Sequence, residues 1–110
     1  MNKRNDTVYI NDILESINQI VIYVRDKSEF EFSANLLLQD AVIRRFEIIG
    51  EAASKISNEY KLTHSSIEWG LMKDMRNKLI HEYFGISANT IYQTIHRDLP
   101  LLKEKLKKLL

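Results

Sequence analysis

One short segment of the chain combines side chains whose types and spacing could cleave a phosphodiester. Arg76, His81 and Tyr83 follow one another at separations of five and two residues. Arginine stays cationic and offers a planar fork of donors to phosphate oxygens, whereas histidine exchanges protons near neutral pH. This combination therefore predicts phosphoryl chemistry in which the arginine binds the phosphate and the histidine moves a proton.

The spacing of the three residues limits how one helix could present them. Arg76 and Tyr83, seven residues apart, share a helix face, but His81 lies about 140° round from Arg76 on an ideal helix. Either the helix deforms near its end, or the long side chains reach into a groove whose other wall comes from a second subunit. The second option predicts a homodimer.

Other polar residues near the segment could support it. Asn77 could orient the substrate or His81, from which it is four residues away on the same helix face. Lys73 and Lys78 would raise the local affinity for phosphate, or they could simply solvate the helix. The remaining histidines, His64 and His96, have no arginine and tyrosine at matching spacing, so we expect them to be ordinary surface or loop residues.

Composition places the segment in an ordinary soluble domain. The 110 residues are 45% hydrophobic and 28% charged, which fits a single domain over residues 1–110. The formal charge of +1 does not indicate nucleic-acid binding, so any RNA affinity must come from local clustering. Cysteine is absent, and neither a zinc-ligand spacing nor a Gly-rich phosphate loop occurs. A reaction without metal or cofactor is therefore expected.

The first residues of the chain do not have the pattern of a targeting sequence or a membrane span. Its apolar residues alternate with the polar Asp12, Glu15 and Asn18, which argues against both a signal peptide and a membrane span. We therefore expect a cytoplasmic protein that does not enter a membrane.

Apolar residues recur at steps of three and four along the whole chain, which predicts helices and no strands. Asp6 or Thr7 could cap the first helix, Ser65 with Glu68 the third as a capping box, and Ser87 the fourth. Gly85 should end the third helix. The predicted helices cover residues 8–25, 34–60, 65–83, 88–96 and 98 to the C-terminus.

Gly50 lies inside the second predicted helix. A glycine there costs about 1 kcal/mol relative to alanine, which is most easily tolerated where another backbone must come close. The position therefore predicts a tight helix crossing.

The pattern Arg76-x4-His81-x-Tyr83, followed by Phe84-Gly85, resembles the R-x4-6-H signature of HEPN ribonucleases and, more closely, the R-x4-H-x-Y form of HepT toxins. Residues 38–53 look like that family's second-helix block, and Asp98-Leu99-Pro100 resembles its turn into the last helix. The resemblance covers nearly the whole chain. It implies an all-α, up-down bundle of four to five helices of HEPN type, which forms a homodimer with the motif at the interface.

The same resemblance implies a function. HepT-like proteins are toxins of type VII-like toxin-antitoxin pairs, metal-independent endoribonucleases whose antitoxin, MntA, is a nucleotidyltransferase that adenylylates the motif tyrosine. Carried over, Arg76 would bind the scissile phosphate and His81 would act as general base or acid. Attack by the RNA 2′-OH would give a 2′,3′-cyclic phosphate. Tyr83 would contact RNA when free, and an attached AMP would block the cleft with charge and bulk.

The residues alone are also compatible with two other functions. The chain could be a non-catalytic helical dimer that binds a nucleotidyltransferase partner or a nucleotide through Arg76 and His81. It could also be a purely structural helical protein. Cleavage of RNA that depends on His81 would favour the enzyme, whereas a monomer without RNA affinity would favour the structural reading.

Overall fold

A computed structural model describes residues 5–85 and 88–110, and for residues 78–85 it describes the backbone but not the side chains. All the regular structure in these described ranges is helical. The helices are α1 (Asp6–Val24), α2 (Glu29–Ser33), α3 (Leu36–Lys55), α4 (Asn58–Thr63), α5 (Trp69–Gly85), α6 (Ala88–Arg97) and α7 (Leu99–Lys107).

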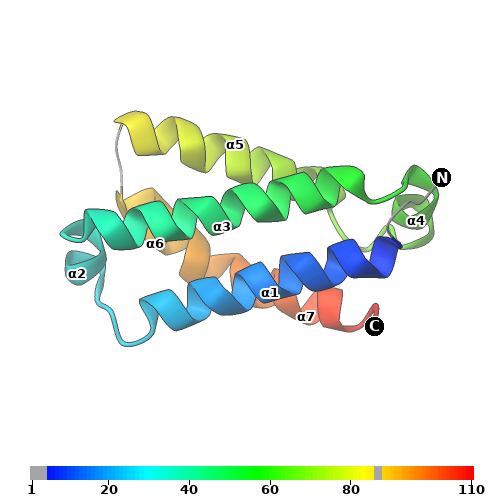
Figure 1. Ribbon diagram of the computed structural model, residues 1–110, viewed down its shortest axis with the longest axis horizontal. Helices are drawn as coiled ribbons and strands as arrows, with labels where there is room; N and C mark the ends of the chain where they lie inside the picture. Colours follow the sequence, from blue (N-terminus) through cyan, green and yellow to red (C-terminus); the bar gives the residue numbers. More distant parts are fainter. Residues whose placement is uncertain (1–4, 86–87) are drawn as a thin grey trace.

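The long helices form an up-down bundle. Helix α3 packs against α1 on one side and α5 on the other, and α1 also contacts α7. Figure 1 shows α1, α3 and α5 lying alongside one another with alternating direction, while α6 and α7 together return along the bundle as its fourth member. Pro100 stands at the start of α7, where a missing backbone N–H costs nothing. The predicted all-α, up-down bundle is confirmed, but the described chain has seven helices where four to five were predicted, because the short helices α2 and α4 were not foreseen.

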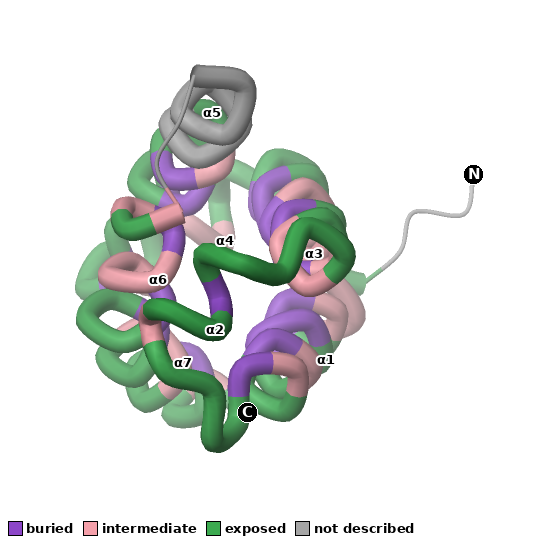
Figure 2. Tube along the Cα trace, turned by 90° about the vertical axis from the view of Figure 1, so that its left-hand side faces the viewer, coloured by how far each residue is buried: buried purple, intermediate pink, exposed green. Residues whose placement is uncertain are grey.

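The core lies between the inward faces of these helices. Figure 2 shows the buried positions of α1, α3, α6 and α7 facing the bundle interior. Ile91 and Ile95 of α6 are buried, as their spacing predicts. Leu71 and Leu101 are apolar but lie at the surface, where they are 49% and 68% exposed. The fully buried large side chains are Phe32, Phe46, Ile10, Ile13, Ile17, Ile20, Ile49, Met72, Ile91, Leu99 and Leu106.

The cap of helix α1 lies one residue before Asp6, the earlier of the two candidate caps. Asn5 is the N-cap, and its side-chain oxygen accepts a hydrogen bond from the backbone N–H of Thr7 at 2.9 Å. The prediction of Asp6 or Thr7 as the cap is therefore wrong. Asn5 supplies the acceptor that the first turn lacks, which leaves the Asp6 carboxylate free for a distant partner.

That distant partner is Ser57, and it divides the second predicted helix in two. The Asp6 carboxylate accepts hydrogen bonds from the Ser57 backbone N–H at 2.8 Å and from its hydroxyl at 2.7 Å. Helix α3 consequently ends at Lys55, and Ser57 caps the short helix α4. The single helix predicted over residues 34–60 is wrong because this tie to α1 interrupts it.

A capping box is present, but at the start of α2. The Ser28 hydroxyl accepts from the Glu31 backbone N–H, and the Glu31 carboxylate accepts from the Ser28 backbone N–H at 2.9 Å. The hydrogen bond from the Ser28 backbone N–H, followed by one with the Ser28 side chain, holds the pKa of the Glu31 carboxyl below its ordinary value. Helix α2 is absent from the predicted helices, which treat Ser28 as part of a polar break.

The box predicted at Ser65 and Glu68 does not start a helix there. The His64 carbonyl accepts from the Ile67 backbone N–H at 3.2 Å and from the Trp69 indole N–H at 3.1 Å, so the chain turns before α5 begins at Trp69. Tyr60 packs beside Trp69, with ring centroids 6.1 Å apart. Burial, followed by the charge of Asp6, raises the pKa of the Tyr60 hydroxyl.

Two further expectations concern the ends of helices. Helix α5 is described as far as Gly85, the residue expected to end it, and the residue that follows lies outside the described ranges. The proposed cap Ser87 lies outside the described residues. None of the described helices is long and apolar enough to span a membrane.

Candidate active site

Helix α5 carries every residue of the motif. Its α-helical backbone runs without interruption from Trp69 to Gly85, so no deformation near its end turns His81 toward Arg76. On regular helix geometry the backbone positions of Arg76 and Tyr83 share a face, whereas that of His81 lies about 140° away from Arg76. The other option, a groove completed from outside this helix, stays a prediction.

Arg76 is placed by contact with α3. A Cβ atom built on Gly50 would lie 3.0 Å from Cδ of Arg76 and 3.1 Å from both its Cβ and Cγ. The close approach predicted at Gly50 is present, but the group that comes close is the aliphatic stem of an arginine and not the neighbouring backbone that was expected. Few Cβ atoms in proteins have contacts this close, so the glycine makes room for the stem.

The guanidinium of Arg76 has a hydrogen-bond partner at Nη1 but none among the described atoms at Nε. Its Nη1 donates a hydrogen bond to Oδ1 of Asn77 at 2.8 Å. Its Nε is buried and has no hydrogen-bond partner among the described atoms. A buried charged donor without a partner is uncommon and is a mark of functional sites, because the missing partner can be a substrate, an ion or water. Among the described atoms this N–H therefore lacks an acceptor, and an anionic oxygen would suit it.

Of the predicted supporting residues, the structure describes the side chains of Asn77 and Lys73 but not those of Lys78 and Tyr83. Asn77 is exposed and contacts Arg76, so the described role of its amide is to hold the guanidinium. Lys73 is exposed one turn before Arg76 on the same helix. The side chains of Lys78, His81 and Tyr83 lie outside the described residues, and only their backbone positions on α5 are placed.

The other two histidines lie away from this helix face and stack on tyrosines. His64 lies 4.3 Å from the ring of Tyr60, and His96 lies 4.3 Å from the ring of Tyr92, both measured between centroids. Each tyrosine precedes its histidine by four residues, which is the spacing of side-chain neighbours on a helix. Both contacts fit the expectation of ordinary surface histidines.

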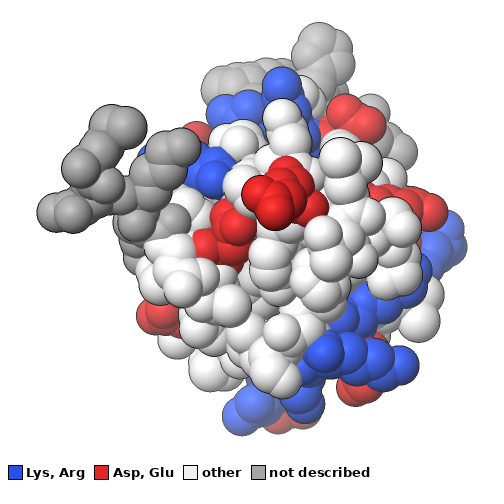
Figure 3. Space-filling view, turned by 90° about the vertical axis from the view of Figure 1, so that its right-hand side faces the viewer, with Lys and Arg blue, Asp and Glu red and all other residues white. Residues whose placement is uncertain are grey.

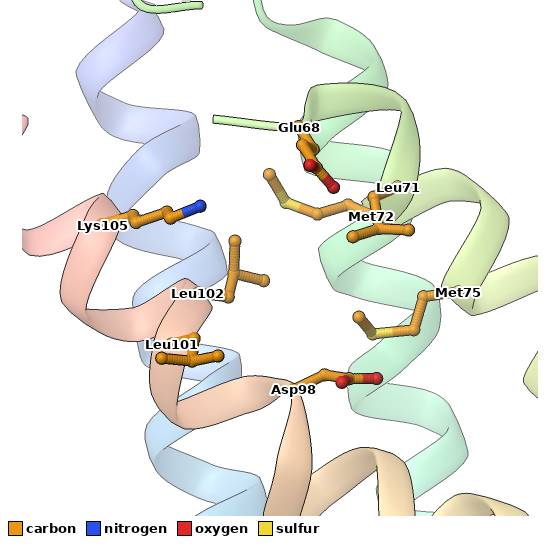
Figure 4. Close-up of a pocket in the computed structure, with 8 residues that line it drawn as sticks. All are labelled: Glu68, Leu71, Met72, Met75, Asp98, Leu101, Leu102 and Lys105. Carbon is orange, nitrogen blue, oxygen red and sulfur yellow. The ribbon is translucent and has the colours of Figure 1, made fainter. Parts of the chain in front are cut away.

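A small pocket beside α5 is separate from the arginine. It lies between the N-terminal half of α5 and the start of α7 and encloses about 170 Å³. Figure 4 shows Met72 and Met75 lining it opposite Leu102, with charged groups at the edge. Nucleotide-sized ligands occupy pockets of roughly 300–1,000 Å³. This pocket is too small for one and has no nucleophile.

Charges on the described surface are mixed. Figure 3 shows the end that carries α4 and the C-terminus, where groups of Lys and Arg are separated by Asp and Glu. The described residues of this end therefore do not form the continuous basic face that nonspecific nucleic-acid binders present. No group of three or more His, Asp or Glu side chains within the described ranges could hold a metal ion.

Comparison with known proteins places this arrangement in a family. The family model described as "Ribonuclease HepT-like" matches residues 13–109. The chain belongs to this family. The match includes α5 with the whole HepT motif, and also Gly50 on α3, so both sides of the described crossing lie in the matched region.

Relatives of this HepT-like chain agree with the assignment. It is 42% identical to a protein of Thermococcus cleftensis named "Probable ribonuclease HepT", over 97% of this chain and 97% of that protein. It is 40% identical to a protein of Methanocaldococcus jannaschii named "Gamma-glutamylcyclotransferase and putative RNase", over 98% of this chain. The chain spans about half of that second relative, 49% of its length. No solved structure matches the chain significantly.

Proposed function

We propose that this HepT-like protein is a metal-independent endoribonuclease in which Arg76 binds the scissile phosphate and His81 transfers a proton. The observation that carries the proposal is the Arg76 guanidinium. Its stem lies against Gly50, its Nη1 is bonded to Asn77, and its buried Nε has no described partner. A guanidinium held in this way costs little reorganisation when it meets the negative charge that develops on a phosphate.

The proposed reaction uses the RNA as its own nucleophile. The 2′-OH loses its proton to His81, acting as general base, and its oxygen attacks the adjacent phosphorus. The bond from phosphorus to the 5′-oxygen breaks, and that oxygen takes up a proton from water as it leaves, while His81 later returns its proton to the solvent. The products are a 2′,3′-cyclic phosphate and a 5′-OH, and Arg76 stabilises the charge on the phosphoryl oxygens throughout. DNA lacks the nucleophile, so it is not a substrate.

The proposed active form is a homodimer. Arg76 and His81 project from an uninterrupted helix at positions about 140° apart, so a second subunit is the source of the missing wall of the groove. Asn77, Lys73 and Lys78 support the substrate from the same helix. The exposed Leu71 and Leu101 give the α5 and α7 side of the bundle apolar surface that association can bury.

Regulation by a partner forms part of the proposal. Tyr83 shares a helix face with Arg76, so AMP attached to its hydroxyl brings a phosphate and a base to the site of substrate binding. The corresponding partner is an MntA-like nucleotidyltransferase, with the present chain as the toxin of the pair. In a reaction with such an enzyme and ATP, the mass of AMP should appear on wild type and be absent from Tyr83→Phe; labelling of both proteins would contradict the assignment.

The experiment that tests the proposed function compares nucleic acids of the same sequence. The purified protein is incubated in EDTA with a single-stranded RNA and with the matching DNA, and products are separated by size. We expect the RNA to be cut and the DNA to stay intact. Intact RNA, or cutting that needs added divalent metal, would contradict the proposal and leave a nucleotide-binding module as the better reading.

A further inference from the structure

Gly50 stands where α3 meets the stem of Arg76. It lies in the second half of α3 and is buried. The three stem atoms of Arg76 nearest to it are consecutive, namely Cβ, Cγ and Cδ, and all lie 3.0–3.1 Å from the place of a Cβ atom on residue 50. The arginine therefore lies lengthwise over the glycine, so a large part of its side chain depends on that space.

The helix itself gains nothing from this glycine. Glycine in a helix interior is less favourable than alanine, and α3 uses alanine for close packing at Ala52 and Ala53, both buried. The same helix therefore tolerates a Cβ atom at nearby buried positions. We relate the absence of a Cβ atom at residue 50 to its contact with the Arg76 side chain. Because Cβ of Arg76 is fixed to the α5 backbone, a methyl group on residue 50 must either separate the helices or rotate the stem.

Rotation of the stem would redirect the guanidinium. The described side chain is held by the glycine at its stem and by Asn77 at Nη1, and the donor between them, Nε, has no described partner. We propose that Gly50 is a positioning residue, which sets the path of the Arg76 stem and so the direction in which the guanidinium meets a substrate phosphate. This inference rests on the proposed ribonuclease function.

The chain supplies a matched control for the test. Gly70 also lies in a helix, and a Cβ atom added there would meet nothing within 4 Å. Gly50→Ala and Gly70→Ala therefore make the same chemical change with and without contact to the arginine. Misplacement of a catalytic group by about an ångström can lower the rate by about 100-fold.

We expect Gly50→Ala to lower kcat for RNA cleavage by about 10- to 100-fold, with a smaller change in KM, while it keeps a cooperative unfolding transition. Gly70→Ala should cleave at nearly the wild-type rate. A wild-type rate for Gly50→Ala would overturn the inference, as would equal losses in the two variants.

A second measurement separates this inference from the proposed function. The Nε–H group of Arg76 gives a resonance in ¹⁵N-edited NMR spectra, which Arg76→Lys identifies by removing it. Gly50→Ala should shift this resonance and Gly70→Ala should leave it in place. If wild type fails to cut RNA, the proposed function fails while the resonance still reports on positioning; an unshifted resonance in Gly50→Ala overturns the inference whatever the activity.

A third variant tests the inference in case Gly50→Ala does not fold. Should Gly50→Ala not fold, the double variant Gly50→Ala/Arg76→Gly removes Cβ, Cγ and Cδ of the stem and should fold again. Recovery would confirm that the space at residue 50 serves the arginine. A double variant that also fails to fold would show that α3 and α5 need the glycine for their own packing, and the inference would be wrong.

Discussion

Replacement of His81 by alanine should lower the rate of RNA cleavage by about 10²- to 10⁴-fold, which is the usual contribution of a positioned general acid or base. In the proposed reaction His81 accepts the 2′-OH proton near neutral pH, a step that Arg76 cannot perform because it stays protonated. The measurement is the single-turnover rate on one RNA at saturating enzyme, together with the oligomer mass and the unfolding transition, which should match wild type.

His96→Ala is the matched control for this variant. His96 is exposed on α6 and stacks on Tyr92, away from the motif helix, so its removal should leave the rate nearly unchanged. If His81→Ala cleaves as fast as His96→Ala, the imidazole of the motif is not the proton carrier. Equal large losses in both variants would point to a general effect of histidine removal on the fold.

The largest expected effect on stability belongs to Phe32. Its side chain is fully buried beneath α2, and its ring centroid lies 5.9 Å from that of Tyr92 on α6. Phe32→Ala removes this packing and leaves a cavity, which typically costs about 3–5 kcal/mol. The free energy of unfolding in urea should fall by that amount, and so should the protection of α2 and α6 backbone amides from hydrogen exchange.

Phe30→Ala controls for the change of residue type. Phe30 is on the same short helix but is 81% exposed, so both substitutions alter helix propensity equally and only one removes a core side chain. We expect Phe30→Ala to change stability by less than about 0.5 kcal/mol. Similar losses in the two variants would mean that α2 does not anchor the bundle through Phe32.

The fold could be predicted from the sequence where local pattern and tertiary packing agree. The apolar spacing around Ile13, Ile17 and Ile20 follows one helix face, and these residues are buried in α1. The predicted helix bounds were wrong where contacts between residues distant in the sequence determine where a helix ends. Nothing in the periodicity of residues 34–60 shows that Asp6, 51 residues away from Ser57, would interrupt the helix.

The two Ser-x-x-Glu sequences show the same limit at a smaller scale. Both Ser28 to Glu31 and Ser65 to Glu68 have the spacing of a capping box, but only the first forms one. At the second, the His64 carbonyl binds the indole of Trp69 and delays the helix. A short motif identifies candidates, and the surrounding contacts choose between them.

The candidate site was predictable in its residues and only partly in its geometry. The motif on α5 and the close approach at Gly50 both follow from the sequence, but the sequence does not give the register of α3 against α5. That register is what places Arg76 over Gly50. The contact of Asn77 with the arginine was also not predicted, because neighbouring residues on a helix do not usually face each other.

The measurement that tests the central claim most directly is cleavage, in EDTA, of an RNA in which a single nucleotide at a mapped cut position carries a 2′-deoxy sugar. If the guanidinium binds the phosphate and the imidazole deprotonates the neighbouring 2′-hydroxyl, cutting should stop at that position and continue elsewhere. Each remaining product should end in a 2′,3′-cyclic phosphate. Continued cutting after the deoxy sugar, or products that end in a free 3′-OH, would contradict it.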